Sequence, residues 1–294
     1  MRVLVTGWAS FEHGEATAGD VLSMRAVHSA LREAGIDSEL AWSPNYQAGF
    51  QTIQDADPAR YTHVVFTCGP AHGRQVLDLH HRYACCRRIA VGVSVLDPED
   101  ASVRGFHRVL ARDDGTRSYP DLSLVEPTAT TPVVGVILAP GQAEYGERGR
   151  HTGVHDELAR WLTDLDCARL SLDTRLDTHD WRHCATPDQL TSVLARLDAI
   201  VSTRLHGLVL GIRMGVPVLA VDPVSGGGKV TAQARALGWP AVVPADKAHS
   251  GAFASWWDWC LSPPARSAAA GCADQPGWTL LTGLLEELRW DVPA

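Results

Sequence analysis

Short apolar runs and amphipathic stretches alternate along the first part of the chain. The runs are rich in valine, leucine and isoleucine and end at glycine or polar residues, which is typical of strands buried on both faces. The stretches between them repeat apolar residues at helical spacing. The pattern predicts strands at residues 3–6, 38–42, 63–67 and 88–93, helices at residues 21–34 and 76–86, and a shorter element at residues 106–112.

A second series of the same kind follows residues 126–132, a proline- and threonine-rich segment without a large apolar residue. It predicts strands at residues 133–138, 168–172, 197–201, 216–222 and 242–243, with helices at residues 155–165, 187–197, 208–215 and 229–237. Small side chains at residues 265–276 predict a break, and residues 278–290 predict a terminal helix. The expected fold class is α/β, with two Rossmann-like parallel-sheet domains at residues 1–128 and 132–294.

Composition and charge narrow the class of protein. The 294 residues exceed one comfortable core, and 45% hydrophobic with 20% charged residues is ordinary for a soluble globular protein. The net charge of −8, without a dense lysine or arginine tract, argues against a nucleic-acid partner. No apolar run approaches ~20 residues, so no membrane span is expected. The chain begins with a strand pattern rather than a signal peptide, so a cytoplasmic location is expected.

Neither the cysteines nor the glycine-rich turns of the chain predict a cofactor site. The seven cysteines have irregular spacing and are expected to be free thiols. Cys167, His179, His183 and Cys184 fit no standard zinc spacing, so no metal is predicted. No Gly-x-Gly-x-x-Gly follows the first strand, which argues against a dinucleotide. The turn at residues 226–229 is not a Walker A motif, and its lysine is either an anion clamp or a solvated surface residue.

The strongest candidate for chemistry follows the predicted strand at residues 197–201. Arg204 and His206 are two residues apart, so in an extended loop they point the same way. We expect a helix to begin at Gly207 and to present unpaired backbone N–H groups. A fixed cation, an imidazole and a helix N-terminus at the carboxyl edge of a sheet suit a phosphate or carboxylate. The alternative is that Arg204 pairs with a structural carboxylate and that His206 is an interior histidine.

The same residues carry a family resemblance. The chain resembles polysaccharide pyruvyl transferases in the order of its C-terminal motifs, which are Arg204-Leu205-His206-Gly207, Gly215-Val216-Pro217-Val218, Asp222, Lys229 and Leu237-Gly238-Trp239-Pro240. It also resembles that family upstream, in Gly19-Asp20 and in Arg112-Asp113 followed by Pro120-Asp121. The resemblance is dense over residues 197–240. Cys68-Gly69-Pro70 stands where the family usually has a glycine-rich turn.

The resemblance implies a GT-B-like fold, with the terminal helix crossing back to the first domain. It implies an enzyme that moves a pyruvyl group from phosphoenolpyruvate to a carbohydrate-type acceptor and releases phosphate, without a metal or organic cofactor. The first domain would face the acceptor and the second would hold the donor. The residues implied are Arg204 and His206 for catalysis, and Gly19, Asp20, Arg112, Asp113, Gly207 and Lys229 for substrate binding.

Other interpretations stay open beside this one. A GT-B glycosyltransferase would use Arg204 to hold the diphosphate of a nucleotide-sugar, and a non-catalytic relative would only bind. Asp20 is more simply a helix cap, because aspartate is strongly preferred there. The tryptophans at positions 256, 257 and 259 are more simply packing than a sugar-stacking surface.

Overall fold

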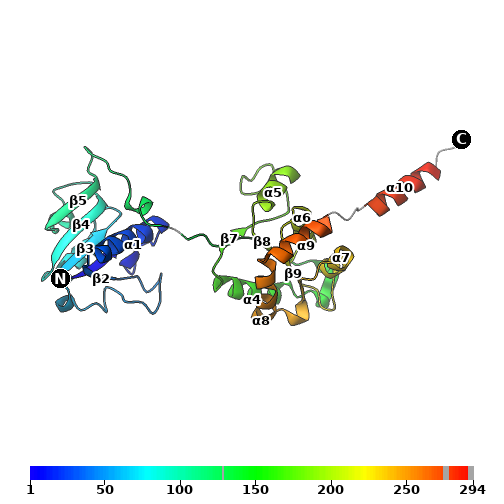
Figure 1. Cartoon of the computed structure of the whole chain (residues 1–294), viewed down its shortest axis with the longest axis horizontal. Coiled ribbons are helices and arrows are strands. Elements are labelled where there is room, and N and C mark those ends of the chain that lie inside the picture. The colour runs from blue at the N-terminus through cyan, green and yellow to red at the C-terminus, as the bar shows by residue number, and fades with distance from the viewer. Residues whose placement is uncertain (128, 274–277, 291–294) are drawn as a thin grey trace. The chain divides into compact units, whose positions relative to one another are not determined.

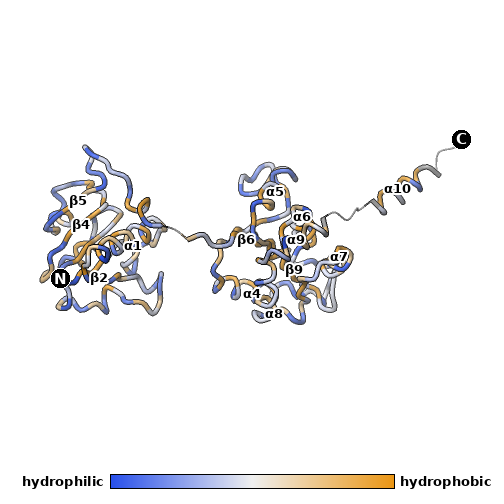
Figure 2. The backbone as a smooth tube through the Cα atoms, viewed as in Figure 1, coloured by the Kyte–Doolittle hydropathy of each residue, from blue (hydrophilic) through white to orange (hydrophobic). Residues whose placement is uncertain are grey.

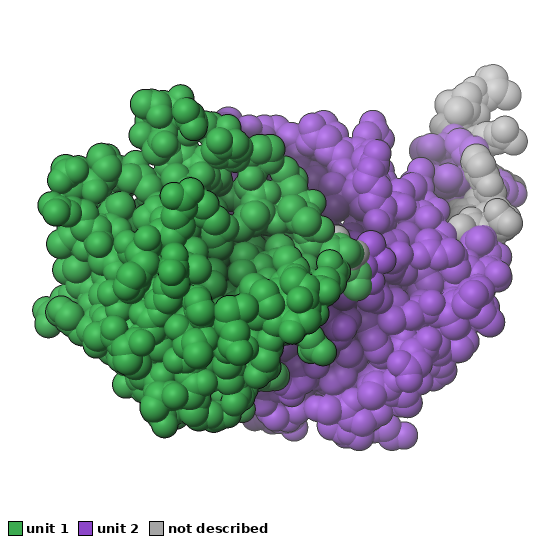
Figure 3. Space-filling model, turned by 60° about the vertical axis from the view of Figure 1, so that its left-hand side comes forward, with its two compact units in different colours: residues 1–129 green, residues 130–294 purple. Residues whose placement is uncertain are grey.

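The chain forms two compact units, Met1–Ala129 and Thr130–Ala294, which Figure 3 colours separately. The computed structural model describes residues 1–127, 129–273 and 278–290 (Figure 1). Each unit contains one sheet of five strands, and all paired strands are parallel. The expected α/β class is confirmed. The chain has the two Rossmann-like sheets expected of a GT-B-like fold.

The sheet of the first unit has the strand order β2-β1-β3-β4-β5. Val3 and Val5 of β1 pack with Met24 of α1, whereas Leu4 packs with Leu79 of α2 in a separate cluster. Because successive side chains of a strand point to opposite faces, α1 and α2 cover opposite faces of the sheet. The elements are β1 (Arg2–Gly7), α1 (Ala18–Glu33), β2 (Asp37–Leu40), β3 (His63–Thr67), α2 (Arg74–Arg82), β4 (Arg87–Ser94), α3 (Ala101–Arg104) and β5 (Arg108–Asp113).

The sheet of the second unit has the order β10-β9-β8-β6-β7. Counted from its own first strand this is the order 2-1-3-4-5, as in the first unit. The elements are β6 (Val133–Ile137), α4 (His151–Thr163), β7 (Ala168–Ser171), α5 (Pro187–Leu194), β8 (Ala199–Ser202), α6 (Leu205–Arg213), β9 (Val218–Asp222), α7 (Lys229–Leu237), β10 (Val242–Pro244), α8 (Ser250–Cys260), α9 (Pro263–Ala273) and α10 (Trp278–Trp290).

This strand order has a consequence for function. In a doubly wound sheet the chain leaves the first and third strands toward opposite sides, and ligands bind outside the carboxyl ends of the strands at that point. In the second unit those two strands are β6 and β8, which pair with each other. The segments that follow them, which lead into α4 and α6, are therefore the first place to look for a site.

Two expectations about the elements are wrong. Residues 265–276 were expected to be a break, but Pro263–Ala273 forms α9, because alanine is the best helix former and Ala265 and Ala269 pack into the interior. The remaining residues of that break, 274–276, lie outside the described residues. Helix α1 begins at Ala18 with Thr17 as its N-cap, so Asp20 is not the N-cap but the third helical residue of a capping box.

The last helices include both a buried and an exposed surface. Trp257 of α8 is buried, and its ring lies 5.6 Å from that of Trp161, so the interpretation of the tryptophans as packing is confirmed. Along α10, apolar and polar positions alternate (Figure 2), and Leu280, Leu284 and Leu288 are exposed. That α10 crosses back to the first unit stays a prediction.

Two further expectations concern the whole chain. All seven cysteines are free thiols, as expected. In the part of the chain that the structure describes, no helix combines the length and apolar character needed to cross a membrane.

Candidate functional site

The carboxyl ends of β6 and β8 are tied together by Thr203. Its Oγ1 accepts a hydrogen bond of 2.8 Å from the backbone N–H of Ala139, which follows β6. The same hydroxyl lies 3.2 Å from Nε2 of His155 on α4. The residue next along the chain is Arg204. The hydroxyl of Thr203 thus links the segment after β6 to α4, one residue before the N-cap of α6.

Helix α6 begins at Leu205, with Arg204 as its N-cap, and not at Gly207 as expected. The two side chains therefore do not project from one extended loop, because Arg204 has extended backbone and His206 lies in the first helical turn. Gly207 is buried in that turn. A Cβ at this position would lie 2.2 Å from Oγ of Ser202, so only glycine lets the turn sit this close to β8.

Arg204 is held by a carboxylate. Its Nη1 donates to Oδ1 of Asp173 at 2.5 Å, and Oδ2 of Asp173 accepts from Nε of Arg175 at 2.7 Å. Burial raises the pKa of Asp173, but the hydrogen bonds from Arg175 and the charges of both arginines outweigh it, so the pKa lies below its ordinary value. The cluster carries two cations and one anion, a net positive charge at the start of α6.

The structure therefore supports part of each interpretation of the pair. Arg204 does pair with a structural carboxylate, as the alternative interpretation expects. Among the described residues, however, only its Nη1 has a hydrogen-bond partner. Nε and Nη2 remain as donors in a side chain that is 22% exposed. His206 is exposed, so it is not an interior histidine, and no hydrogen bond of its ring is recorded in the described part of the chain.

Asp222 organises the next loop along this edge of the sheet. It is fully buried at the end of β9, and its Oδ2 accepts from the backbone N–H groups of Gly228 and Thr231 at 2.7 and 2.8 Å. These bonds fix where α7 begins. The first residue of α7 is Lys229, which is exposed and whose Nζ lies 6.0 Å from the centre of the Tyr145 ring. Lys229 and Arg204 thus stand at helix starts on the same edge of one sheet.

The remaining predicted residues lie in the first unit. Arg112, at the end of β5, donates to Asp113 at 2.9 Å and to Asp121 at 2.6 Å. Asp20 closes the capping box of α1 by accepting from the N–H of Thr17, so it has a capping role at the third helical position and not at the N-cap. Gly19 lies in the same first turn. These residues have structural partners within their own unit, and any role toward substrate stays a prediction.

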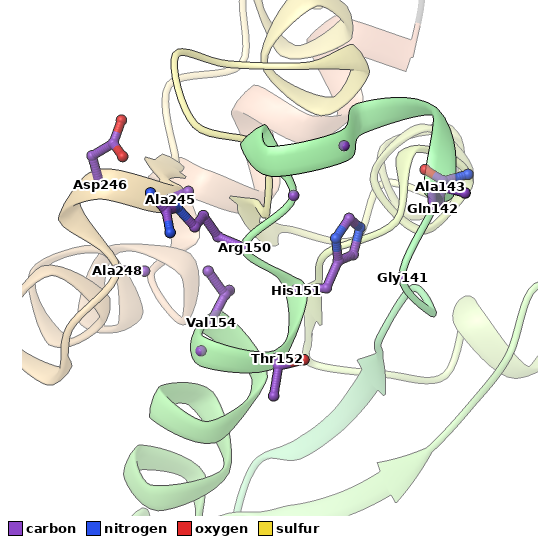
Figure 4. Close-up of a pocket in the computed structure, with 13 residues that line it drawn as sticks. Gly141, Gln142, Ala143, Arg150, His151, Thr152, Val154, Ala245, Asp246 and Ala248 are labelled. Atoms are coloured by element: carbon purple, nitrogen blue, oxygen red, sulfur yellow. The ribbon is translucent and has the colours of Figure 1, made fainter.

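The second unit contains a pocket that the sequence did not predict. It measures about 690 Å³ and lies at the start of α4 (Figure 4). Arg150, His151, Gly153 and Asp246 line it, together with Gly141, Gln142, Ala143, Gly146, Gly149, Thr152, Val154, Ala245 and Ala248. The available signal was the pair Arg150-His151 before an amphipathic helix. We expected that helix only from residue 155, because Gly153 weakens the helical pattern in its first turn.

The four residues weighed as zinc ligands do not form a ligand cluster. Among the described residues, no group of three or more histidine, cysteine, aspartate or glutamate side chains is arranged to hold a metal ion. Cys167 is instead part of the apolar core of the second unit.

Comparisons with known proteins give one informative result. The family model for polysaccharide pyruvyl transferase matches residues 159–225. The matched segment contains Asp173, Arg204, His206 and Gly207. The resemblance inferred from the motifs is confirmed over this segment. No curated protein matches the chain.

Solved structures give only distant similarity. A spinosyn rhamnosyltransferase complexed with thymidine diphosphate has 14% identity and a TM-score of 0.36, covering 97% of this chain and 100% of the other. An E. coli heptosyltransferase with ADP has 13% identity and a TM-score of 0.29, covering 88% of this chain and 100% of the other. A glycosyltransferase from Streptomyces nogalater has 14% identity and a TM-score of 0.32, covering 98% of this chain and 100% of the other. At TM-scores this low, the fold of the chain is judged from its own sheets.

Proposed function

We propose that this protein is a transferase that moves a pyruvyl group from phosphoenolpyruvate to a carbohydrate-type acceptor and releases phosphate. The observation that carries the proposal is the family match over residues 159–225, which includes the start of α6 with Arg204, His206 and Gly207. The position of these residues, beyond the carboxyl end of β8, is where a doubly wound sheet binds ligands.

The donor carries a phosphate and a carboxylate, so it needs at least two cationic contacts. Arg204 and the backbone N–H groups at the start of α6 supply one. The paired Asp173 orients the guanidinium, and Nε and Nη2 remain to meet an oxygen of the donor. Lys229 is a candidate for the second contact within the same unit, and Arg112 is the candidate from the first unit.

His206 is the proposed acid–base residue, because it is exposed in the first turn of α6 beside Arg204. The donor methylene gains a proton and becomes a methyl group, which leaves a cationic carbon. Two neighbouring acceptor hydroxyls bond to that carbon, and its bond to the phosphate oxygen breaks. Of the two hydroxyl protons, one balances the methyl group and the other leaves with phosphate. This chemistry requires no metal or organic cofactor.

We also propose a division of roles between the units. The second unit, with Arg204 and Lys229, would bind the donor, and the first would present acceptor-binding residues. Gly19, Asp20, Arg112 and Asp113 are the candidates there, from the turn that starts α1 and the end of β5.

Thermal melting with and without ligand, together with steady-state kinetics of two variants, tests the proposed function. A ligand at ~100 times its dissociation constant stabilises the folded state by about 2.7 kcal/mol, which is several degrees for domains of this size. We expect that shift with phosphoenolpyruvate in the wild type and its loss in Arg204→Ala, with donor affinity lower by roughly ten- to a hundredfold. His206→Gln should instead lower turnover by about 10²–10⁴-fold with donor binding retained.

Arg213→Ala is the matched control, since Arg213 is an exposed arginine at the other end of α6. It should leave the melting shift and the turnover unchanged. A shift with a nucleotide-sugar and none with phosphoenolpyruvate, together with sugar transfer, would favour the glycosyltransferase instead. Near-normal turnover of His206→Gln with collapsed donor affinity would make the histidine a binding residue.

A further inference from the structure

The start of α4 resembles the start of α6 but is a separate place. Both helices have an arginine as N-cap, Arg150 and Arg204, and neither cap makes a side-chain hydrogen bond to its helix. Both also have a histidine in the first turn, His151 and His206. The first three N–H groups of a helix have no acceptor within it, so each start offers free donors. Of the two, the start of α4 opens into the pocket of about 690 Å³.

His151 is a second and independent sign of a ligand. The side chain lines the pocket and projects from the first turn of α4 between the two limbs of the 141–149 loop (Figure 4). The residue is 7% exposed, and its Nε2 has no hydrogen-bond partner among the described residues. Buried nitrogens are nearly always partnered, by protein, water or a bound group, so an unpartnered one calls for an explanation.

Charge around the pocket favours an anion at the helix start. Arg150 lines the pocket, and Lys229 is close enough to act on His151. Burial lowers the pKa of His151, and the charge of Lys229 lowers it further against the opposing effect of Asp222 and Glu144. A neutral imidazole carries one ring N–H, which can donate to an oxyanion.

The one carboxylate of the pocket is already engaged. Asp246 accepts from Oγ of Ser225 at 2.8 Å and from the N–H of Gly226 at 3.3 Å. These hydrogen bonds lower its pKa, and so does the charge of Arg150. Asp246 therefore stays ionised on the side of the pocket away from His151 (Figure 4), where it would repel an anion and accept from a hydroxyl group.

We propose that the start of α4 is an oxyanion site that takes the phosphate group of a small ligand. The N–H groups of His151, Thr152 and Gly153 and the imidazole of His151 bind the phosphate oxygens, and Arg150 adds charge. The pocket is larger than an inorganic anion needs, and Asp246 offers an acceptor for hydroxyl groups, which favours a phosphate ester of a polyol over free phosphate. This site goes beyond the proposed function, which places the donor at α6.

Gly153 provides a variant that blocks the site and keeps the fold. Gly153 lines the pocket, and a Cβ there would meet no atom within 4 Å, so Gly153→Leu adds a bulky side chain at the pocket wall without a clash at Cβ. Gly271→Leu is the matched control, because Gly271 is a helical glycine of α9 with the same open surroundings. His151→Phe is the second variant, which fills a similar space without a ring nitrogen.

The test is a titration of the full-length protein with inorganic phosphate and with glucose 1-phosphate, followed by amide NMR. We expect saturable shifts at residues 151–153. Gly153→Leu and His151→Phe should each weaken binding by roughly ten- to a hundredfold, and Gly271→Leu should bind like the wild type. His151→Phe should melt no lower than the wild type, because it removes an unpaired buried nitrogen. Tighter binding of the ester assigns the pocket to esters, and equal affinities assign it to free phosphate.

Shifts that stay linear with phosphate concentration, or that occur only at residues 205–207, would overturn the proposal. So would wild-type affinity in Gly153→Leu. The outcome is separable from that of the proposed function. Phosphate binding at α4 without pyruvyl transfer would reject the proposed function but not this site. Pyruvyl transfer without phosphate binding at α4 would reject this site but not the proposed function.

Discussion

At the scale of single residues, the arginines expected to bind anions are each held by carboxylates. Arg204 contacts Asp173, which lies 31 positions earlier, and Arg112 contacts Asp113 and Asp121. Sequence patterns report neighbours along the chain and their periodicity. They placed the cationic groups at the sheet edge, but they gave no means of seeing Asp173, because the fold brings it from the loop after a different strand. A guanidinium held by a carboxylate is oriented in advance.

Asp121 offers a test of the carboxylate cluster around Arg112. Burial raises its pKa, but hydrogen bonds from Ser123 and Arg112 outweigh it and lower the pKa from 3.8 to about 2. Because the folded value is the lower one, the stabilisation is present above about pH 4 and is lost as pH falls toward 2. We expect Asp121→Asn to lower the free energy of unfolding at pH 6 by on the order of 1 kcal/mol, since water screens this partly exposed pair.

Urea unfolding of the full chain between pH 6 and pH 3 measures this effect. The gap between wild type and Asp121→Asn should narrow steadily below about pH 4. Asp258→Asn is the control, because Asp258 is an exposed carboxylate of α8 without a recorded partner in the described residues. A gap that stays constant across the range would show that Asp121 does not stabilise the fold through its charge.

At the scale of elements, most strands were predictable, and so were the starts of α5, α7 and α10, but the starts of α1, α4 and α6 were not. Strand β3 was expected at residues 63–67 and is found at His63–Thr67, because a run buried on both faces leaves an unambiguous apolar signature. Helices α1 and α4 begin three and four residues before their expected starts, and α6 begins at Leu205 instead of Gly207. A helix start is set by capping residues and by glycines in the first turn. These residues do not contribute to the periodic apolar pattern from which the helices were predicted. The site depends on those first turns, so its geometry was the least predictable part.

The start of α7 shows how strongly one buried carboxylate can fix an element. Asp222 accepts from the N–H groups of Val224, Gly228 and Thr231 and from Oγ1 of Thr231. We expect Asp222→Ala to lower the free energy of unfolding by roughly 2–4 kcal/mol, because several donors lose their acceptor in a buried position. Urea unfolding of the purified variant measures this loss.

Thr231→Val is the matched comparison for Asp222→Ala. It removes only the bond from the hydroxyl and leaves the three backbone donors paired, so a loss of about 1 kcal/mol is expected. If the two variants were equally stable, the carboxylate would not be what holds the start of α7. Lys229 would then need another explanation for its position at this edge of the sheet.

At the scale of the whole molecule, the chain repeats one topology. Both sheets have the order 2-1-3-4-5, and each unit has its own apolar clusters. The class and the two Rossmann-like sheets were predictable, because each βαβ unit leaves the same alternation of patterns. The strand order was not, because periodicity within a strand carries no information about which strand lies beside it. That order is what singles out β6 and β8, and with them the starts of α4 and α6.

If the second unit alone binds the donor, that binding should survive separation from the first unit. We expect a protease site inserted between Ala129 and Thr130 to be cut readily, because the flanking residues are exposed. After cleavage and separation, fragment 130–294 should keep a melting shift with phosphoenolpyruvate, and fragment 1–129 should show none. Differential scanning fluorimetry of both fragments measures this, with Arg204→Ala in fragment 130–294 as the negative control. A shift in fragment 1–129, or one that appears only in the uncut chain, would contradict the assignment of the donor to the second unit. Pyruvyl transfer itself should require both fragments, since the acceptor-binding candidates Arg112 and Asp113 lie in the first.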